Sequence, residues 1–287
     1  MRRTAQLALV VPIATVLAGA GCQHDWDQWI ASGEGGSPVT MTSAGGSMAM
    51  NSSGQGGSSQ SSSTGGGSSI GTCPDESMVA VLVGSHTVCI DRTEVTRGKY
   101  AAWLSKGATG PMQVSGCEND SNHTPLDPDW PPIGGLDFPV VFVDWCDASA
   151  YCRGNGKRLC RQLGSEDPVQ AGPEGEWYGV CSNNGNWLYP YGPAYLKGTC
   201  NGDSTGAGAV TVVGALAGCA NTAGVLDLSG NVWEWEDGCN LGENCLVRGG
   251  AFNSLPHSLR CANLEISPRM QHSVNVGFRC CADPIPA

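Results

Sequence analysis

Hydrophobic residues lie in short runs that Gly, Pro, Asn and Ser separate along most of the chain. Met78–Ile90 contains mainly β-forming residues and is interrupted at Gly84-Ser85-His86, which predicts a β-hairpin. Phe138–Val143, with the sequence F-P-V-V-F-V, predicts a short buried strand. Because the runs are short, we expect a domain with much loop and little regular sheet.

Three short segments have the polar and apolar spacing of helices. The first follows Thr96, a suitable N-cap, within Asp91–Leu104. The second follows Asp144, another capping residue, and has the sequence W-C-D-A-S-A-Y-C-R. The third is Pro173–Cys181, which begins with acidic residues that suit the positive end of a helix dipole.

The segment Asp227–Trp235, D-L-S-G-N-V-W-E-W, combines a turn with two aromatic residues. Trp233 and Trp235 are two positions apart, so in an extended chain both rings point to one face. Glu234 then points to the opposite face. We expect the tryptophans to pack in a core while the other face presents oxygen ligands.

The first 22 residues are predicted to be a targeting segment. A charged start, Met1-Arg2-Arg3, precedes the apolar run Ala5–Ala18 and the small residues before Cys22. Cys22 after small residues resembles a bacterial lipoprotein signal, in which this cysteine is lipidated. Ordinary secretion, with Cys22 incidental, is the alternative. The apolar run is too short to predict a membrane span.

Residues 23–72 are predicted to be a disordered tether, because 31–72 consists mainly of Gly and Ser. Residues 73–287 remain as one domain, long enough for a real core. The net charge of −11 argues against nucleic acid as a partner, and against electrostatic adhesion to an anionic membrane. We therefore expect a periplasmic or cell-surface lipoprotein whose membrane contact is the lipid.

The chain has 15 cysteines, and 14 of them follow Cys22. An even number in an exported domain predicts a disulfide framework. Short spacings suggest that Cys73 bonds to Cys89, Cys200 to Cys219, and Cys239 to Cys245. The partners of four other cysteines stay open: Cys117, Cys146, Cys160 and Cys281. No zinc cluster is expected, because the chain has no C-x-x-C pair of the zinc type.

Seven motifs occur in an order that resembles one known domain family. They read E-V-T-R-G-K-Y-A-A-W-L, F-P-V-V-F-V-D-W-C-D-A-S-A-Y-C-R-G-N-G-K-R-L, G-E-W-Y-G-V-C, Y-P-Y-G, D-L-S-G-N-V-W-E-W, V-R-G-G-A-F and N-V-G-F-R-C. Residues 73–283 therefore resemble the formylglycine-generating enzyme (sulfatase-modifying factor) domain. The resemblance implies an irregular α+β fold, related to C-type lectins and low in secondary structure.

The enzyme of this family oxidises a sulfatase cysteine to formylglycine, using O₂ and a copper ion held by two cysteines. In the corresponding stretch, Gly249–Leu259, the two cysteine positions hold Ser254 and Leu259, and the active-site serine position holds Ala251. Neither Ser nor Leu can replace a thiolate on Cu(I). Copper is therefore not expected here.

The resemblance also implies cross-links and a calcium site. Its disulfides would join Cys152 to Cys280 and Cys181 to Cys261. The calcium ligands would be carbonyl oxygens of Ser229, Gly230 and Val232 and the carboxylate of Glu234. The alternative at this motif is a turn with two core tryptophans and a solvated glutamate. A second family calcium site would use Asn201, but its acidic partner segment has no counterpart.

Other titratable residues have simpler explanations. Asp144, Asp147 and Glu176 suit acid–base chemistry, but capping and helix-dipole contacts also account for them. The remaining candidates are histidines without helical ligand spacing, for which surface or hydrogen-bonded positions are expected: His86, His123, His257 and His272.

Three functions remain. The first is a non-catalytic binding or structural module, whose ligand is an unknown protein or small molecule. Its recognition loop would be Asn253–His257, with Asn253, Ser254 and His257 as contact residues. The second is a formylglycine-generating oxidase that uses cysteines elsewhere, such as Cys280-Cys281. The third is an enzyme that keeps the pocket and changes the chemistry.

Overall fold

The computed structural model describes residues 72–108, 114–118, 120, 122–162, 175–240 and 243–286. Contacts divide the chain into two units, 1–64 and 65–287, and every described residue belongs to the second. The targeting segment, Cys22 and residues 23–71 of the predicted tether lie outside the described residues, whereas Thr72 forms an isolated β-bridge with Ile285. Within the described part, no helix combines the length and apolar character needed to cross a membrane.

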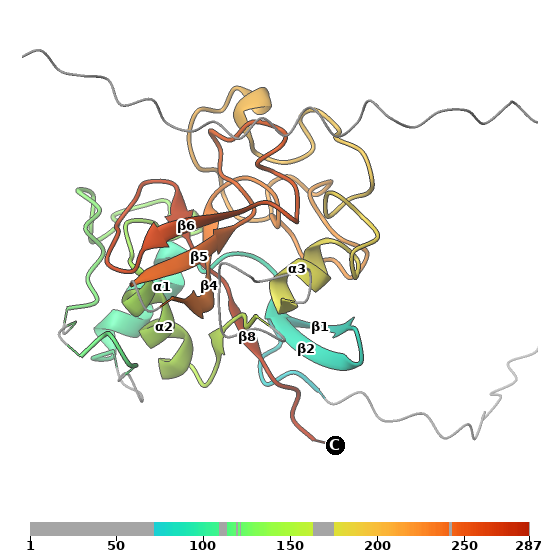
Figure 1. Ribbon diagram of the computed structural model, residues 1–287. Helices are drawn as coiled ribbons and strands as arrows, with labels where there is room; N and C mark the ends of the chain where they lie inside the picture. Colours follow the sequence, from blue (N-terminus) through green and yellow to red (C-terminus); the bar gives the residue numbers. More distant parts are fainter. Residues whose placement is uncertain are drawn as a thin grey trace, which may run out of the picture. The chain divides into compact units, whose positions relative to one another are not determined.

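Two small four-stranded sheets carry the regular β-structure of the described residues (Figure 1). The first has the order β1 (Met78–Val83), β2 (His86–Asp91), β8 (Cys280–Ala282) and β3 (Arg158–Leu159). The second has the order β6 (Leu264–Pro268), β5 (Asn244–Arg248), β4 (Trp233–Cys239) and β7 (Val276–Gly277). Neighbouring strands are antiparallel except β4 and β7. The predicted hairpin is confirmed as β1 and β2.

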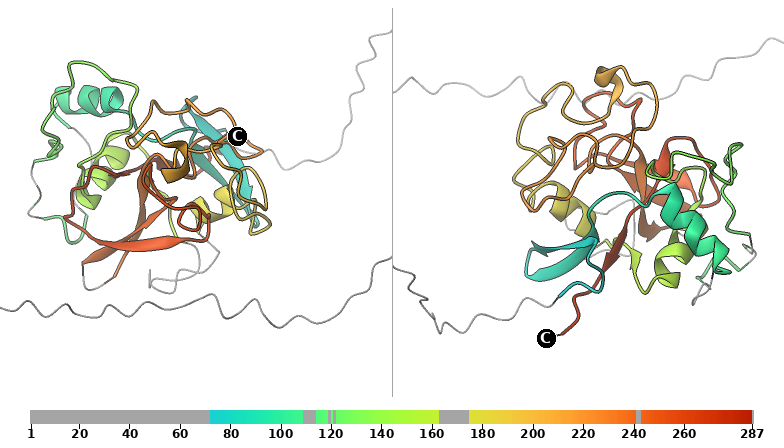
Figure 2. Two further views of the ribbon diagram at one scale, coloured as in Figure 1. Left: turned by 90° about the horizontal axis from the view of Figure 1, so that it is seen from above. Right: turned by 180° about the vertical axis from the view of Figure 1, so that it is seen from behind.

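The helices are α1 (Arg97–Ser105), α2 (Trp145–Gly154), α3 (Glu176–Cys181) and the 3₁₀ helix η3 (Asp203–Thr205). Figures 1 and 2 show α1 beside α2, on a different side of the domain from the β1–β2 hairpin. Tyr100 of α1 stacks on Tyr151 of α2, with ring centroids 5.3 Å apart. The predicted irregular α+β fold is confirmed: long loops, including most of 182–232, connect these short elements.

Both predicted N-caps are present. The Thr96 hydroxyl accepts a hydrogen bond from the Lys99 amide at 3.2 Å. Asp144 accepts from the Asp147 amide at 2.8 Å, and Asp147 accepts from the Asp144 amide at 3.2 Å. This reciprocal capping box fixes both carboxylates at the start of α2.

The strand predicted at Phe138–Val143 does not form. Its backbone bonds to several separate segments instead of one neighbouring strand: the Val140 amide donates to Val95 and the Phe142 amide to Ser273. Phe142 also has a φ of 57°, in the left-handed region, which interrupts an extended chain. The apolar pattern still marks buried residues, because Val140 is fully buried.

Trp233 and Trp235 pack in the largest core cluster, as their shared face predicts. The indole N–H of Trp235 donates to the Val143 carbonyl at 3.1 Å. A second core cluster lies beneath the β1–β2 hairpin and contains Trp177 of α3. The two clusters meet the same strand, since Cys280 belongs to the first and Cys281 to the second.

All 14 cysteines of the described part form disulfides. The pairs are 73–89, 117–146, 152–280, 160–281, 181–261, 200–219 and 239–245. The five pairs expected from the sequence are among them. The other two give partners to the cysteines left open, joining Cys117 to Cys146 and Cys160 to Cys281.

We expect long-range cross-links to stabilise this loop-rich domain most. Replacing both Cys152 and Cys280 by Ala removes a cross-link between residues 128 positions apart. This change should lower the free energy of unfolding by about 2–5 kcal/mol. The matched control is Cys239→Ala with Cys245→Ala, which spans only 6 residues and should cost less. Denaturant unfolding measures both, and equal losses would contradict the expectation.

Candidate functional site

The positions that align with the family's copper-binding cysteines lie together in space. A Cβ placed on Gly250 would lie 2.9 Å from Leu259 Cδ2 and 3.2 Å from Ser254 Cβ. Leu259 is 1% exposed and Ser254 is 9% exposed. The Ser254 hydroxyl accepts a hydrogen bond from the Ala251 amide at 2.9 Å. The site thus contains a buried hydroxyl and a buried aliphatic side chain in place of two thiols.

This geometry changes the expectation for the recognition loop. Ser254 was expected to contact a ligand, but its side chain turns inward because it caps the Ala251 turn. Asn253 and His257 are exposed, as a recognition surface requires. Leu255 between them is 53% exposed, which sequence reasoning did not include.

The turn at Ser229–Asn231 packs against a second loop. Gly230 has a φ of +78°, and any Cβ there would collide with the Asn201 carbonyl. The Asn231 amide donates to the same carbonyl at 2.7 Å. The turn is buried, with Ser229 at 1% and Val232 at 0% exposure.

Glu234 was expected to face ligands or solvent, but it is buried in an ion pair with Arg279. Its Oε2 accepts from Arg279 Nε at 2.6 Å and from the Trp177 indole at 2.8 Å. Its Oε1 accepts from a terminal guanidinium nitrogen of Arg279 at 2.7 Å. Because Arg279 already neutralises both oxygens, this arrangement does not fit a calcium ion at Glu234. The contacts of Glu234 thus do not support the expected ligand set of Ser229, Gly230, Val232 and Glu234, and calcium at this turn stays a prediction.

Two further acids lie near this ion pair. Burial, followed by the negative charge of Asp227, raises the pKa of Glu94 well above its usual range. The Asn231 amide group donates to Glu94 Oε1 at 3.0 Å, whereas Glu94 Oε2 has no hydrogen-bond partner. Glu94, Asp227 and Glu234 thus share the one guanidinium of Arg279.

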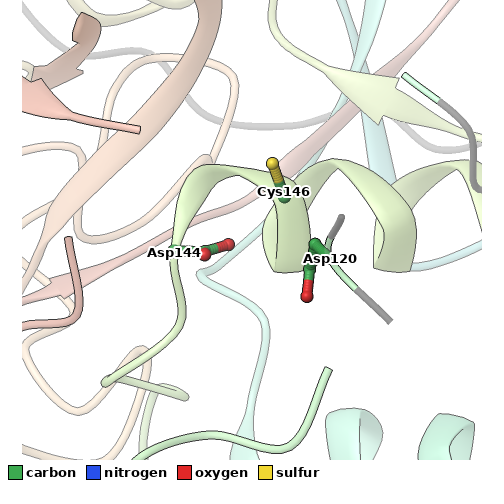
Figure 3. Close-up of side chains that lie close together, drawn as sticks. All are labelled: Asp120, Asp144 and Cys146. Atoms are coloured by element: carbon green, nitrogen blue, oxygen red, sulfur yellow. The ribbon is translucent and has the colours of Figure 1, made fainter. Parts of the chain in front are cut away.

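A second cluster of charged groups lies at the start of α2 (Figure 3). His123 Nδ1 is 3.1 Å from Asp147 Oδ1 and 3.2 Å from Asp120 Oδ2. His272 Nε2 is 3.8 Å from Asp147 Oδ2 and 4.0 Å from Asp144 Oδ2. Burial and the charge of Asp147 raise the pKa of Asp144 to about 6. Asp144 and Asp147 do cap the helix, but capping does not account for two imidazoles beside them.

The sequence contained little that would reveal this cluster. His123 and His272 are far apart in the chain and lack any ligand motif, and surface or hydrogen-bonded positions were expected for both. Both are hydrogen-bonded, as that expectation allowed: His123, which is 7% exposed, to Asp147, and His272 to the Met270 carbonyl. The useful signal was the capping pattern at Asp144, because such a box fixes two carboxylates near one helix end.

The buried acids predict a pH-dependent stability. The pKa of Glu94 is higher in the folded chain than in the unfolded chain. Its stabilising contribution to the free energy of unfolding is therefore fully present below the unfolded-state pKa. That contribution is lost as pH rises through the folded-state pKa. Glu94→Gln keeps an oxygen for Asn231 and removes the charge. We expect the Tm at pH 8 to rise by about 2–4 °C and the gain to shrink near pH 4.

The control is Glu76→Gln, which changes an exposed carboxylate. Thermal unfolding monitored by circular dichroism at both pH values measures the effect. A Glu94→Gln variant that is less stable than the parent at pH 8 would show that the Glu94 charge is well compensated.

Comparisons with known proteins place this geometry in context. A family model described as "Sulfatase-modifying factor enzyme 1-like domain" matches residues 38–284. The chain is similar to the formylglycine-generating enzyme of Mus musculus, with 28% identity over 187 residues, covering 56% of this chain and 49% of the relative. It is also similar to the inactive Cα-formylglycine-generating enzyme 2 of Bos taurus, with 30% identity over 163 residues and 50% of each chain covered.

The chain spans about half the length of the curated relatives it matches. Among solved structures, variable protein 1 of Treponema denticola has a TM-score of 0.47 and 16% identity, covering 72% of this chain and 91% of that one. The family match begins at residue 38, within the segment predicted to be a tether and outside the described residues.

Proposed function

The chain belongs to the sulfatase-modifying factor family, and from that premise we propose that it is a non-catalytic binding module built on the family's fold. The observation that carries this proposal is the content of the former copper site. Ser254 and Leu259 meet beside Gly250, and neither side chain provides the thiolate that Cu(I) prefers. The curated relatives include both active enzymes and proteins named as inactive, so loss of activity has a parallel among them.

Cysteines elsewhere in the described part do not supply the missing thiols. The alternative oxidase would use Cys280 and Cys281, but these bond to Cys152 and Cys160. A disulfide sulfur has no proton to lose and does not replace a thiolate ligand. An oxidase would therefore first have to reduce cross-links that join the C-terminal strand to the rest of the domain.

The proposed recognition surface is the loop that contains Asn253, Leu255 and His257, all of which are exposed. This loop is supported from behind, since the Tyr189 hydroxyl donates to the Pro256 carbonyl at 3.0 Å. Tyr191 stacks on Tyr189 with ring centroids 5.4 Å apart. An exposed loop fixed to an aromatic cluster suits ligand recognition, because little ordering entropy is lost on binding. The ligand would be a protein or a small molecule.

We also propose that the protein is exported to a bacterial envelope and anchored through a lipid on Cys22. The support is the charged start, the apolar run and the small residues before Cys22. A domain with seven disulfides is compatible with an oxidising compartment.

The absence of oxidase activity is tested with a sulfatase-motif peptide, O₂ and added copper. We expect no aldehyde product from this protein, detected by mass spectrometry after hydrazine labelling, while the Mus musculus relative serves as the active control. The double variant Ser254→Cys with Leu259→Cys, reduced before assay, should gain Cu(I) affinity in a chelator competition. Aldehyde formed by the unsubstituted protein would overturn the proposal.

The lipid anchor is tested in a Gram-negative host grown with radiolabelled palmitate. The full chain should take up the label and partition into detergent, whereas Cys22→Ser should lose both properties. Ser32→Ala is the matched control and should behave like the parent. Equal labelling of the parent and of Cys22→Ser would show that Cys22 is not the lipidated residue.

A further inference from the structure

The cluster at the start of α2 contains hydrogen-bond acceptors that face one another, one of which, Asp147 Oδ2, also accepts from the Asp144 amide at 3.2 Å. His272 Nδ1 lies 3.1 Å from the Met270 carbonyl. Because a carbonyl only accepts, Nδ1 must carry the proton of this imidazole. A neutral His272 therefore presents the lone pair of Nε2 to Asp144 Oδ2 at 4.0 Å and to Asp147 Oδ2 at 3.8 Å. With His272 neutral, three acceptor atoms converge at one point, and a cation placed between them would stabilise this arrangement.

A third carboxylate gives independent support. The Asp120 side chain is 9% exposed, and its Oδ2 lies 3.2 Å from His123 Nδ1, the same nitrogen that lies 3.1 Å from Asp147 Oδ1. One of its oxygens lies within 4.8 Å of a carboxylate oxygen of Asp144. One nitrogen of His123 thus serves two carboxylates, and grouping several buried carboxylates is costly unless further positive charge lies nearby. Asp120 is thus a second indication that the cluster accommodates a cation.

The surrounding structure holds these groups in place. The capping box fixes Asp144 and Asp147, and His123 Nδ1 lies 3.1 Å from the other oxygen of Asp147. In Figure 3 the Asp144 carboxylate points toward the side of α2 where Asp120 lies, while Cys146 points away from both. Cys146 is bonded to Cys117, so its sulfur is no ligand but ties the segment that precedes Asp120 to the helix.

We propose that Asp144, Asp147 and His272, with Asp120 beside them, bind one divalent transition metal ion of the zinc class. His272 Nε2 lies 3.8 and 4.0 Å from the two carboxylate oxygens, and the ligand atoms of the three residues all lie within 4.8 Å of one another, so an ion between them would lie about 2.3–2.8 Å from each. One imidazole with two or three carboxylates suits Zn²⁺ or Mn²⁺ better than Ca²⁺, which takes oxygen ligands. His272 Nδ1 donates a hydrogen bond to a backbone carbonyl, as the second nitrogen of a metal-ligating histidine usually does.

The competing explanation is a proton instead of a metal. The side-chain hydrogen bond with Asp147 raises the pKa of His123, so a charged His123 partly balances the carboxylates. A protonated His272 would in the same way direct its Nε2–H toward the Asp144 oxygen and Asp147 Oδ2, so protons on both imidazoles are the full form of this explanation. Direct metal binding distinguishes the two explanations.

The experiment uses the untagged full chain, treated with EDTA and dialysed, and titrated with Zn²⁺ by calorimetry. We expect one equivalent to bind with a micromolar or lower Kd and to raise the Tm. His272→Ala removes a partly exposed ligand, and Asp144→Asn removes a charge while keeping a good N-cap. Each should raise the Kd more than about tenfold. His86→Ala, an exposed histidine outside the cluster, is the control and should bind like the parent.

Three results would overturn the proposal. The first is that the parent binds no stoichiometric Zn²⁺. The second is that the parent and both cluster variants bind Zn²⁺ with equal affinity. The third is that the parent binds Ca²⁺ in preference to Zn²⁺. The first would favour the protonated cluster, the second another site, and the third an all-oxygen site. None of these results bears on the absence of oxidase activity, which is measured separately.

Discussion

The structure depends on three consecutive residues, Arg279, Cys280 and Cys281, which tie the C-terminal segment to much of the domain. Arg279 forms the buried ion pair with Glu234 of β4. Cys280 is bonded to Cys152 at the end of α2, and Cys281 to the cysteine that follows β3. In the described residues the sheets and helices are short and much of the chain is loop, so the disulfides add cohesion to the backbone hydrogen bonds that these loops form.

In the described residues every cysteine forms a disulfide, so none of them presents a free thiol. A strand points neighbouring side chains to opposite faces, so Cys280 and Cys281 each bond on a different side. The same geometry that makes them useful as cross-links separates them as metal ligands. The positions that align with the family's copper-binding cysteines differ in another way: a hydroxyl and an aliphatic side chain lie there, and Ser254 accepts a hydrogen bond from a local backbone amide.

Local chemistry was predictable from the sequence where it depends on near neighbours. The caps at Thr96 and Asp144, the hairpin at Met78–Ile90 and the packing of Trp233 with Trp235 all follow from spacing within a few residues. Sequence reasoning failed where distant segments decide the outcome. Glu234 forms its ion pair with an arginine 45 positions away. Periodicity predicted which face of the strand Glu234 occupies, but it could not predict which residue would contact it there.

The same limit applies to the strand expected at Phe138–Val143 and to the charged cluster at α2. Val140 and Phe142 bond to separate segments, which no local pattern encodes. His272 lies beside Asp147 although the two are 125 positions apart in the chain. The order of the motifs did not predict that contact. The resemblance to a known family supplied the fold, but it directed attention to Glu234 and Ser254 instead of to this cluster.

The central claim is that the scaffold persists while its thiols are bound in cross-links. The most direct test is a count of free thiols in the Cys22→Ser chain, denatured without reductant and treated with an alkylating reagent. Intact mass should show no adduct, since all remaining cysteines are bonded. Two alkylated cysteines in the chain would contradict the account.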